Sequence, residues 1–96
     1  MAARLSWSPD ALADLDSLSD FIAADSTVYA RAVVRTIIEA THHLADFPES
    51  GRVVPEFHDP SMREIFAFSY RILYRIRGTD DIMIVNIIHG RRSLER

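Results

Sequence analysis

Residues 70–89 have the sequence YRILYRIRGTDDIMIVNIIH, in which two apolar segments flank a short polar one. Apolar and basic side chains alternate over residues 70–77, as they do in a strand with only one face in the core. The glycine and aspartates of residues 78–81 are typical of a hairpin turn. Residues 82–89 are almost continuously apolar, which predicts a central strand buried on both faces.

The alternation divides the first of these strands into an apolar face and a mostly basic one. The apolar face carries Tyr70, Ile72, Tyr74 and Ile76, and the basic face carries Arg71, Leu73, Arg75 and Arg77. We expect the apolar face to pack on helices. The basic face then lies on the other side of the sheet, exposed beside a bare apolar strip of the neighbouring strand.

The two segments before residue 70 predict a strand and a loop. Residues 63–68 repeat with a period of two, which predicts another strand. Residues 48–62 hold three of the four prolines, so we expect a loop draped over the surface.

The first half of the chain predicts a short strand followed by two helices. Residues 4–7 alternate as in a strand, and Ser8 and Pro9 then begin a helix that ends near Asp25. A second amphipathic helix runs from about Thr27 to Phe47, where Pro48 disfavours helical geometry. Two such helices joined by a few polar residues form an antiparallel hairpin.

The order of elements is β-α-α-β-β-β, which defines an α+β fold. We expect a small, mostly antiparallel four-stranded sheet packed on a helical hairpin. With 96 residues the chain is long enough for one core only, so residues 1–96 form a single domain.

Composition excludes several classes of protein. There is no cysteine, so disulfides, cysteine nucleophiles and cysteine zinc sites are ruled out. No apolar run is long enough to cross a membrane, and residues 1–5 lack the apolar stretch of a secretory signal. We therefore expect a cytoplasmic protein without membrane association, cofactor or metal.

Charge is distributed unevenly along the chain. Residues 1–50 have a net charge of −5 and residues 51–96 a net charge of +2, and all eleven basic residues are arginines. The basic face, with Arg91 and Arg92 of the tail nearby, would suit an anionic or amphipathic ligand. An ordinary solvated sheet face is the alternative.

Two further side chains are candidates for function. His89 ends the last strand and could move a proton near neutral pH, or could have no role. Phe21 lies at the edge of the apolar stripe of the first helix, where an aromatic residue lines a groove for a partner or packs at a boundary.

Five segments, in order along the chain, resemble the RelE/ParE superfamily of toxins from bacterial toxin–antitoxin modules. They are WSPDA (7–11), LDSLSDFIA (15–23), FPESGR (47–52), SYRILYRI (69–76) and IHGRR (88–92). The resemblance implies a small toxin held inactive by a cognate antitoxin. It also leaves two activities open.

One implied activity is RelE-like cleavage of mRNA on the ribosome. By resemblance, Arg71 and Arg92 would then contact phosphate and His89 would act as acid or base, making these three the catalytic residues. The net charge of −3 and the absence of lysine count against it, because an acidic protein gains little affinity for RNA from counterion release.

The other implied activity, which we favour, is ParE-like inhibition of DNA gyrase by protein binding. Such a toxin is not an enzyme, and its antitoxin is usually of the ribbon-helix-helix type. The expected residues for binding target or antitoxin are Arg71, Arg75, Arg77, Arg91, Arg92 and Phe21. A diverged member without toxicity is a third possibility.

Overall fold

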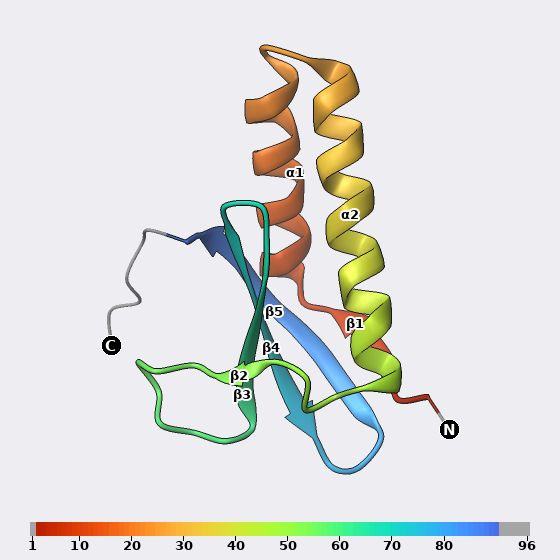
Figure 1. Ribbon diagram of the computed structural model, residues 1–96, viewed down its shortest axis with the longest axis vertical. Coiled ribbons are helices and arrows are strands. Elements are labelled where there is room, and N and C mark those ends of the chain that lie inside the picture. The colour runs from red at the N-terminus through yellow and green to blue at the C-terminus, as the bar shows by residue number, and fades with distance from the viewer. Residues whose placement is uncertain (1, 91–96) are drawn as a thin grey trace.

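The computed structural model describes residues 2–90, in which two helices lie against one face of a five-stranded sheet (Figure 1). The elements are β1 (Arg4–Trp7), α1 (Pro9–Ala23), α2 (Thr27–Asp46), β2 (Arg52–Val53), β3 (Met62–Ala67), β4 (Tyr70–Arg77) and β5 (Asp81–His89).

The sheet has the strand order β1-β5-β4-β3-β2. β1 runs parallel to β5, and the other neighbouring strands are antiparallel, which confirms the predicted mostly antiparallel α+β fold. The fifth strand, β2, falls inside the segment that we expected to be loop only. Two residues are too short to show an alternating pattern, so the sequence carries no signal for it.

Both helices begin where the sequence predicts, because a serine caps each of them. The Ser8 hydroxyl accepts a hydrogen bond from the N–H of Ala11, and the Ser26 hydroxyl accepts one from the N–H of Tyr29. Such caps satisfy N–H groups that have no partner within the helix itself.

A β-bulge in β5 changes which side chains of this strand share a face, although its apolar side chains pack on both sides of the sheet as expected. Leu73 pairs with Asn86 and Tyr74 pairs with Ile84, so Val85 is an extra residue. The extra residue reverses the alternation, and Ile84 and Ile87 therefore lie on the same face, in the core beneath the helices.

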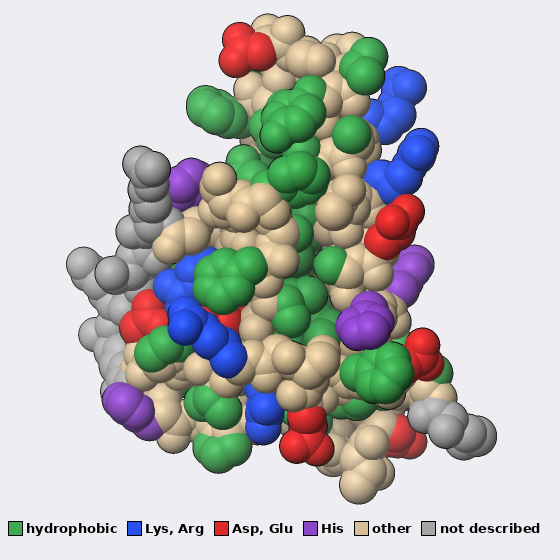
Figure 2. Space-filling model, viewed as in Figure 1, with side chains coloured by type: hydrophobic (Ala, Val, Ile, Leu, Met, Phe, Trp, Pro, Cys, Tyr) green, Lys and Arg blue, Asp and Glu red, His purple; other side chains and the backbone are tan. Residues whose placement is uncertain are grey.

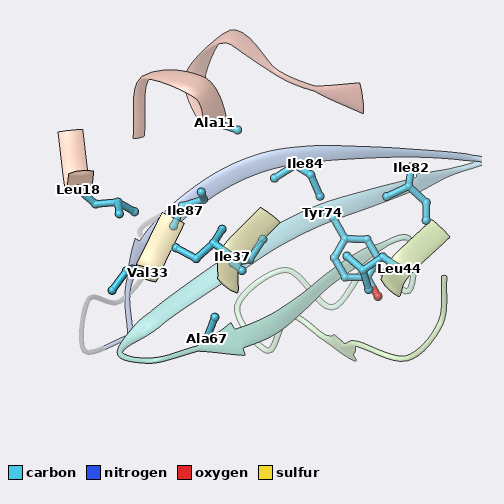
Figure 3. Packing of buried hydrophobic residues seen from close by; sticks show 11 residues of the cluster. Ala11, Leu18, Val33, Ile37, Leu44, Ala67, Tyr74, Ile82, Ile84 and Ile87 are labelled. Carbon is cyan, nitrogen blue, oxygen red and sulfur yellow. The ribbon is translucent and has the colours of Figure 1, made fainter. Parts of the chain in front are cut away.

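The main core lies between the helices and this helix side of the sheet. In Figure 3, Ile37 and Leu44 of α2 lie over β4, beside Ile87 and Tyr74. The predicted apolar face of β4 is the one that packs here, which confirms how the two faces of that strand divide.

Part of the opposite side of the sheet is covered by residues 48–61, which include β2 and which we call the strap. A second apolar cluster forms beneath it, made of Val54, Met62 and Leu73 with Phe57, Val85 and Ile88 packed around them. The apolar strip that we expected to be bare is thus covered, because the strap contributes apolar side chains of its own.

Tyr74 fastens the start of the strap to the core. Its hydroxyl donates to the carbonyl of Pro48 at 2.7 Å and accepts from the N–H of Gly51 at 3.0 Å. Burial raises the pKa of the Tyr74 phenol above its usual value. A Cβ atom at Gly51 would come within 2.6 Å of this hydroxyl, so a larger residue does not fit there.

Replacing Tyr74→Phe should destabilise the fold, because it leaves two main-chain groups of the strap without their partner. We expect a loss of about 1–3 kcal/mol in the free energy of unfolding, measured by urea denaturation. Tyr29→Phe is the control: this tyrosine is exposed, and its replacement should change stability by less than about 0.5 kcal/mol. Equal effects of the two substitutions would contradict the role of Tyr74.

The raised pKa of Tyr74 also predicts a pH dependence. The folded chain holds the phenolic proton more tightly than the unfolded chain does, so the associated stability is complete below the unfolded pKa and is lost as pH rises through the folded pKa. Between about pH 9 and pH 11 the free energy of unfolding should fall more steeply for the wild type than for Tyr74→Phe. Parallel curves for the two proteins would refute this.

Candidate functional site

Arg71 is the first residue of the predicted basic face, and it is buried, with only 5% of its surface exposed. Its Nε atom donates to Glu64 Oε1 at 2.6 Å, and its two Nη atoms donate to the Glu56 carboxylate at 3.0 and 2.9 Å. Glu64 also accepts a hydrogen bond from Arg52 Nε at 2.6 Å. Two arginines and two carboxylates therefore form one ion cluster that joins β4, β3 and the strap.

The ion cluster corrects the expectation of an exposed guanidinium at Arg71. Hydrogen bonds to Glu56, and then the bonds and charge of Glu64, raise the pKa of the guanidinium still further above its usual value. A bidentate contact to Glu56 uses the donor pair that would otherwise suit a phosphate. The sequence places Arg71 on the correct face but contains no pattern that shows Glu56 folding over it.

Arg75 and Arg77 complete the basic face, and both are partly exposed beside acidic residues. Arg75 Nη1 donates to the Ser61 hydroxyl at 3.2 Å and lies 3.6 Å from Asp59, and Arg77 pairs with Asp81 at 3.0 Å. The face is therefore largely charge-balanced. Arg91 and Arg92 lie outside the described residues.

Hydrogen bonds to the Asp59 carboxylate from the main chain and hydroxyl of Ser61 lower the pKa of Asp59, and Arg75 contributes to the same shift. This carboxylate remains charged near neutral pH, and it balances part of the charge of Arg75.

His89 lies on the opposite side of the sheet from Arg71. It pairs with Tyr70, against whose ring it packs edge to face at 5.9 Å, whereas Arg71 pairs with Ile88. Tyr70 packs against the core beneath the helices, and Arg71 is held beneath the strap. The candidate proton carrier and the candidate phosphate ligand thus do not meet at one point.

Phe21 and His89 border a common hollow of about 460 Å³ between α1 and the end of β5. Leu18 and Ile87 contribute apolar surface to it, and Asp14 contributes a carboxylate. Phe21 is 78% exposed and is one of the most exposed large apolar side chains of the described residues. The structure therefore brings two of the candidate residues together, without Arg71.

A second exposed apolar surface lies at the other edge of the sheet, and the sequence analysis did not identify it. Phe66 and Phe68 are each 53% exposed, and Tyr29 of α2 packs edge to face on Phe68 with ring centres 6.2 Å apart. Hydrophobic side chains form a band between the strands and α2 in Figure 2. Two aromatic residues flanking the end of a strand are the only signal that could have found it.

Within residues 2–90 no three histidine or acidic side chains gather as a metal site would require. In the same residues no helix combines the length and the hydropathy needed to span a lipid bilayer.

A helical hairpin packed on one face of a mostly antiparallel five-stranded sheet defines a small α+β protein. The family of ParE toxins from parDE type II toxin–antitoxin systems matches this chain over residues 5–94. The chain therefore belongs to this family, and its resemblance to the RelE/ParE superfamily is confirmed.

Individual relatives agree with this assignment. Toxin ParE1 of Mycobacterium tuberculosis, in strains CDC 1551 and H37Rv, is 30% identical over 97 residues, which cover all of this chain and 98% of the relative. A solved chromosomal ParDE system from P. aeruginosa has a similar fold, with a TM-score of 0.74 and 24% identity over 92% of this chain and 96% of the other.

A toxin–antitoxin complex from the RelE side of the superfamily is also similar. The RelBE2 complex of Mycobacterium tuberculosis matches with a TM-score of 0.66 and 18% identity, covering 93% of this chain and 99% of the other. At this identity the likeness establishes the fold and not the activity.

Replacing Arg71→Gln should be severely destabilising, because it leaves the buried Glu64 carboxylate with less compensation. We expect a loss of about 3–5 kcal/mol in the free energy of unfolding. The matched control is Arg77→Gln on the same strand, where an exposed ion pair contributes less than about 1 kcal/mol. A well-folded Arg71→Gln protein of nearly wild-type stability would show that the ion cluster is dispensable.

Proposed function

We propose that this chain is a toxin that binds and inhibits DNA gyrase, and that a cognate antitoxin of the ribbon-helix-helix type neutralises it. Gyrase acts in the cytoplasm, and the proposal therefore places the chain there. The observation that favours a protein-binding toxin over a nuclease is the position of Arg71, enclosed by two carboxylates on the side of the sheet opposite to His89.

The charge of the chain supports the same choice. A ribosome-dependent nuclease must approach RNA, whose phosphates favour basic proteins. This chain has a net charge of −3, and within the described residues the arginines of β4 lie beside carboxylates. Most of the exposed large hydrophobic side chains of the described residues are aromatic, and aromatic residues often contribute much of the binding energy in protein interfaces.

An antitoxin partner is supported by the apolar side chains that the fold leaves uncovered. Phe21 of α1 lies beside the end of β5, and Phe66 and Phe68 lie at the end of β3. Surfaces of this kind promote aggregation unless a partner covers them. The chain alone should therefore be less soluble than its complex with an antitoxin.

The purified chain should inhibit supercoiling of relaxed plasmid by gyrase and ATP, or leave cleaved plasmid behind. The same reaction with a type I topoisomerase serves as the control for general effects on DNA. Normal supercoiling at a large molar excess of folded chain would exclude gyrase as the target.

Phe21→Ala should weaken binding to gyrase or to the antitoxin by about tenfold or more, because the exposed ring would be buried in a complex. Leu12→Ala, on another exposed position of α1, is the matched control and should have little effect. Binding curves that match the wild type for both partners would remove Phe21 from the interface.

The nuclease alternative has its own test, which leaves the gyrase result independent. In a translating extract, a RelE-like activity would cleave mRNA, and His89→Ala would lower its rate about 10²–10⁴-fold with folding intact. We expect mRNA to stay intact with the wild-type chain. Cleavage that depends on His89 would overturn our choice between the two activities.

A further inference from the structure

The outer edge of β3 is open beyond β2. Along β3 the main-chain groups of successive residues point alternately toward β4 and toward β2. The carbonyl of Ser61 accepts from the N–H of Ile76 on the β4 side, and the carbonyl of Met62 accepts from the N–H of Val54 on the β2 side. Phe66 belongs to the set that faces β2. β2 pairs only with Arg63 and Glu64, so the outward N–H and C=O groups of Phe66 have no partner within residues 2–90.

At the opposite edge of the sheet, the main-chain groups of β5 have partners. β1 covers β5 as far as Ile84, and beyond that point side chains from around the start of α1 take over. The Ser8 hydroxyl donates to the carbonyl of Val85 at 2.8 Å, and the Asp14 carboxylate accepts from the N–H of Ile87 at 2.9 Å. Of the two edges, the β3 edge is therefore the one prepared for an added strand.

Aromatic side chains flank this open position on both sides of the sheet. The guanidinium of Arg52 stacks over the ring of Phe66, with 5.2 Å between its central carbon and the ring centre. On the α2 side, Phe68 contacts Tyr29. A hollow of about 450 Å³ past the end of β3 is lined by Phe66, Phe68 and Ser69, together with His89 and Gly90 at the end of β5. Successive side chains of an added strand would contact these two surfaces alternately.

The turn that presents Phe68 is strained. Phe68 has a φ angle of 55° in the two-residue connection between Ala67 and Tyr70, a conformation that favours glycine. A bulky aromatic residue there lowers stability and leaves its ring half exposed. Strained backbone of this kind is concentrated at functional positions.

The positive charge of Arg52 at this edge indicates which kind of added strand would fit. Arg52 uses Nε to bind Glu64, and its side chain is 58% exposed, with no bond from its Nη atoms to any of residues 2–90. A carboxylate on the strap side of an added strand would meet these two donors. The edge therefore fits an extended, apolar segment that carries an acidic residue.

We propose that the antitoxin inserts an extended arm of this composition as a sixth strand against β3, with main-chain hydrogen bonds to Phe66 and a carboxylate on Arg52. This inference rests on the proposed toxin–antitoxin function. Strand addition uses main-chain pairing for affinity and side-chain pockets for specificity.

The direct test is amide hydrogen exchange of Phe66, measured by NMR. The probe is the complex of this chain with the protein encoded by the reading frame beside its own. Phe66 should exchange fast in the free chain and at least about 100-fold more slowly in the complex. A complex that forms while Phe66 exchange stays unchanged would overturn the strand addition and leave the proposed function intact.

Two other occupants give distinguishable results that would also overturn the inference. Protection that grows with the concentration of the chain alone would indicate a second copy at this edge. Protection by gyrase but not by the antitoxin would assign the edge to the target. An adjacent protein that does not bind the chain at all would refute both the antitoxin partner and this arm.

Variants separate main-chain pairing from side-chain contact. Phe66→Pro removes the outward N–H, which an edge strand tolerates, whereas Phe66→Ala removes only the ring. We expect Phe66→Pro to weaken antitoxin binding about tenfold more than Phe66→Ala, and Arg52→Gln to weaken it about tenfold relative to wild type. Circular dichroism checks that each variant folds, and equal affinities of wild type and all variants would overturn the proposal.

Discussion

The contact of Arg71 with Glu64 and Glu56 is the interaction on which the arrangement of the sheet depends. Arg71 belongs to β4, Glu64 to β3 and Glu56 to the strap, so a single guanidinium joins three segments that are distant in sequence. Glu64 is fully enclosed, and a buried carboxylate is stable only with charged or hydrogen-bonding partners. The strap and the sheet side that it covers therefore form one unit.

This unit shapes what the protein can recognise. The carboxylates of Glu64 and Glu56 occupy the guanidinium of Arg71, so this side chain has fewer donors to offer an external phosphate. We therefore place the proposed recognition surfaces around Phe21 and around Phe66 and Phe68, where exposed aromatic rings lie. Apolar surface of this kind suits a protein partner better than a nucleic acid, whose surface is dominated by phosphate.

The sequence predicted the elements well because each depends on local pattern: Ser8 and Ser26 cap the helices, and alternation defines β4. It failed where two distant segments decide the outcome. The bulge at Val85 reverses the alternation of β5 without a local mark, and the burial of Arg71 requires Glu56 to fold back over it. Alternation shows which face a side chain occupies but not what covers that face.

The two edges of the sheet illustrate how stability and binding compete in a small toxin. An open strand edge beside aromatic rings is a site for aggregation, and proteins usually block such edges. Here Ser8 and Asp14 occupy the edge at β5, whereas Phe66 at β3 is left open and Phe68 is held in a strained turn beside it. A chain that is produced with an antitoxin can keep such an edge if, as we propose, the antitoxin covers it in the complex. The same contact would then protect the fold and control the activity of the toxin.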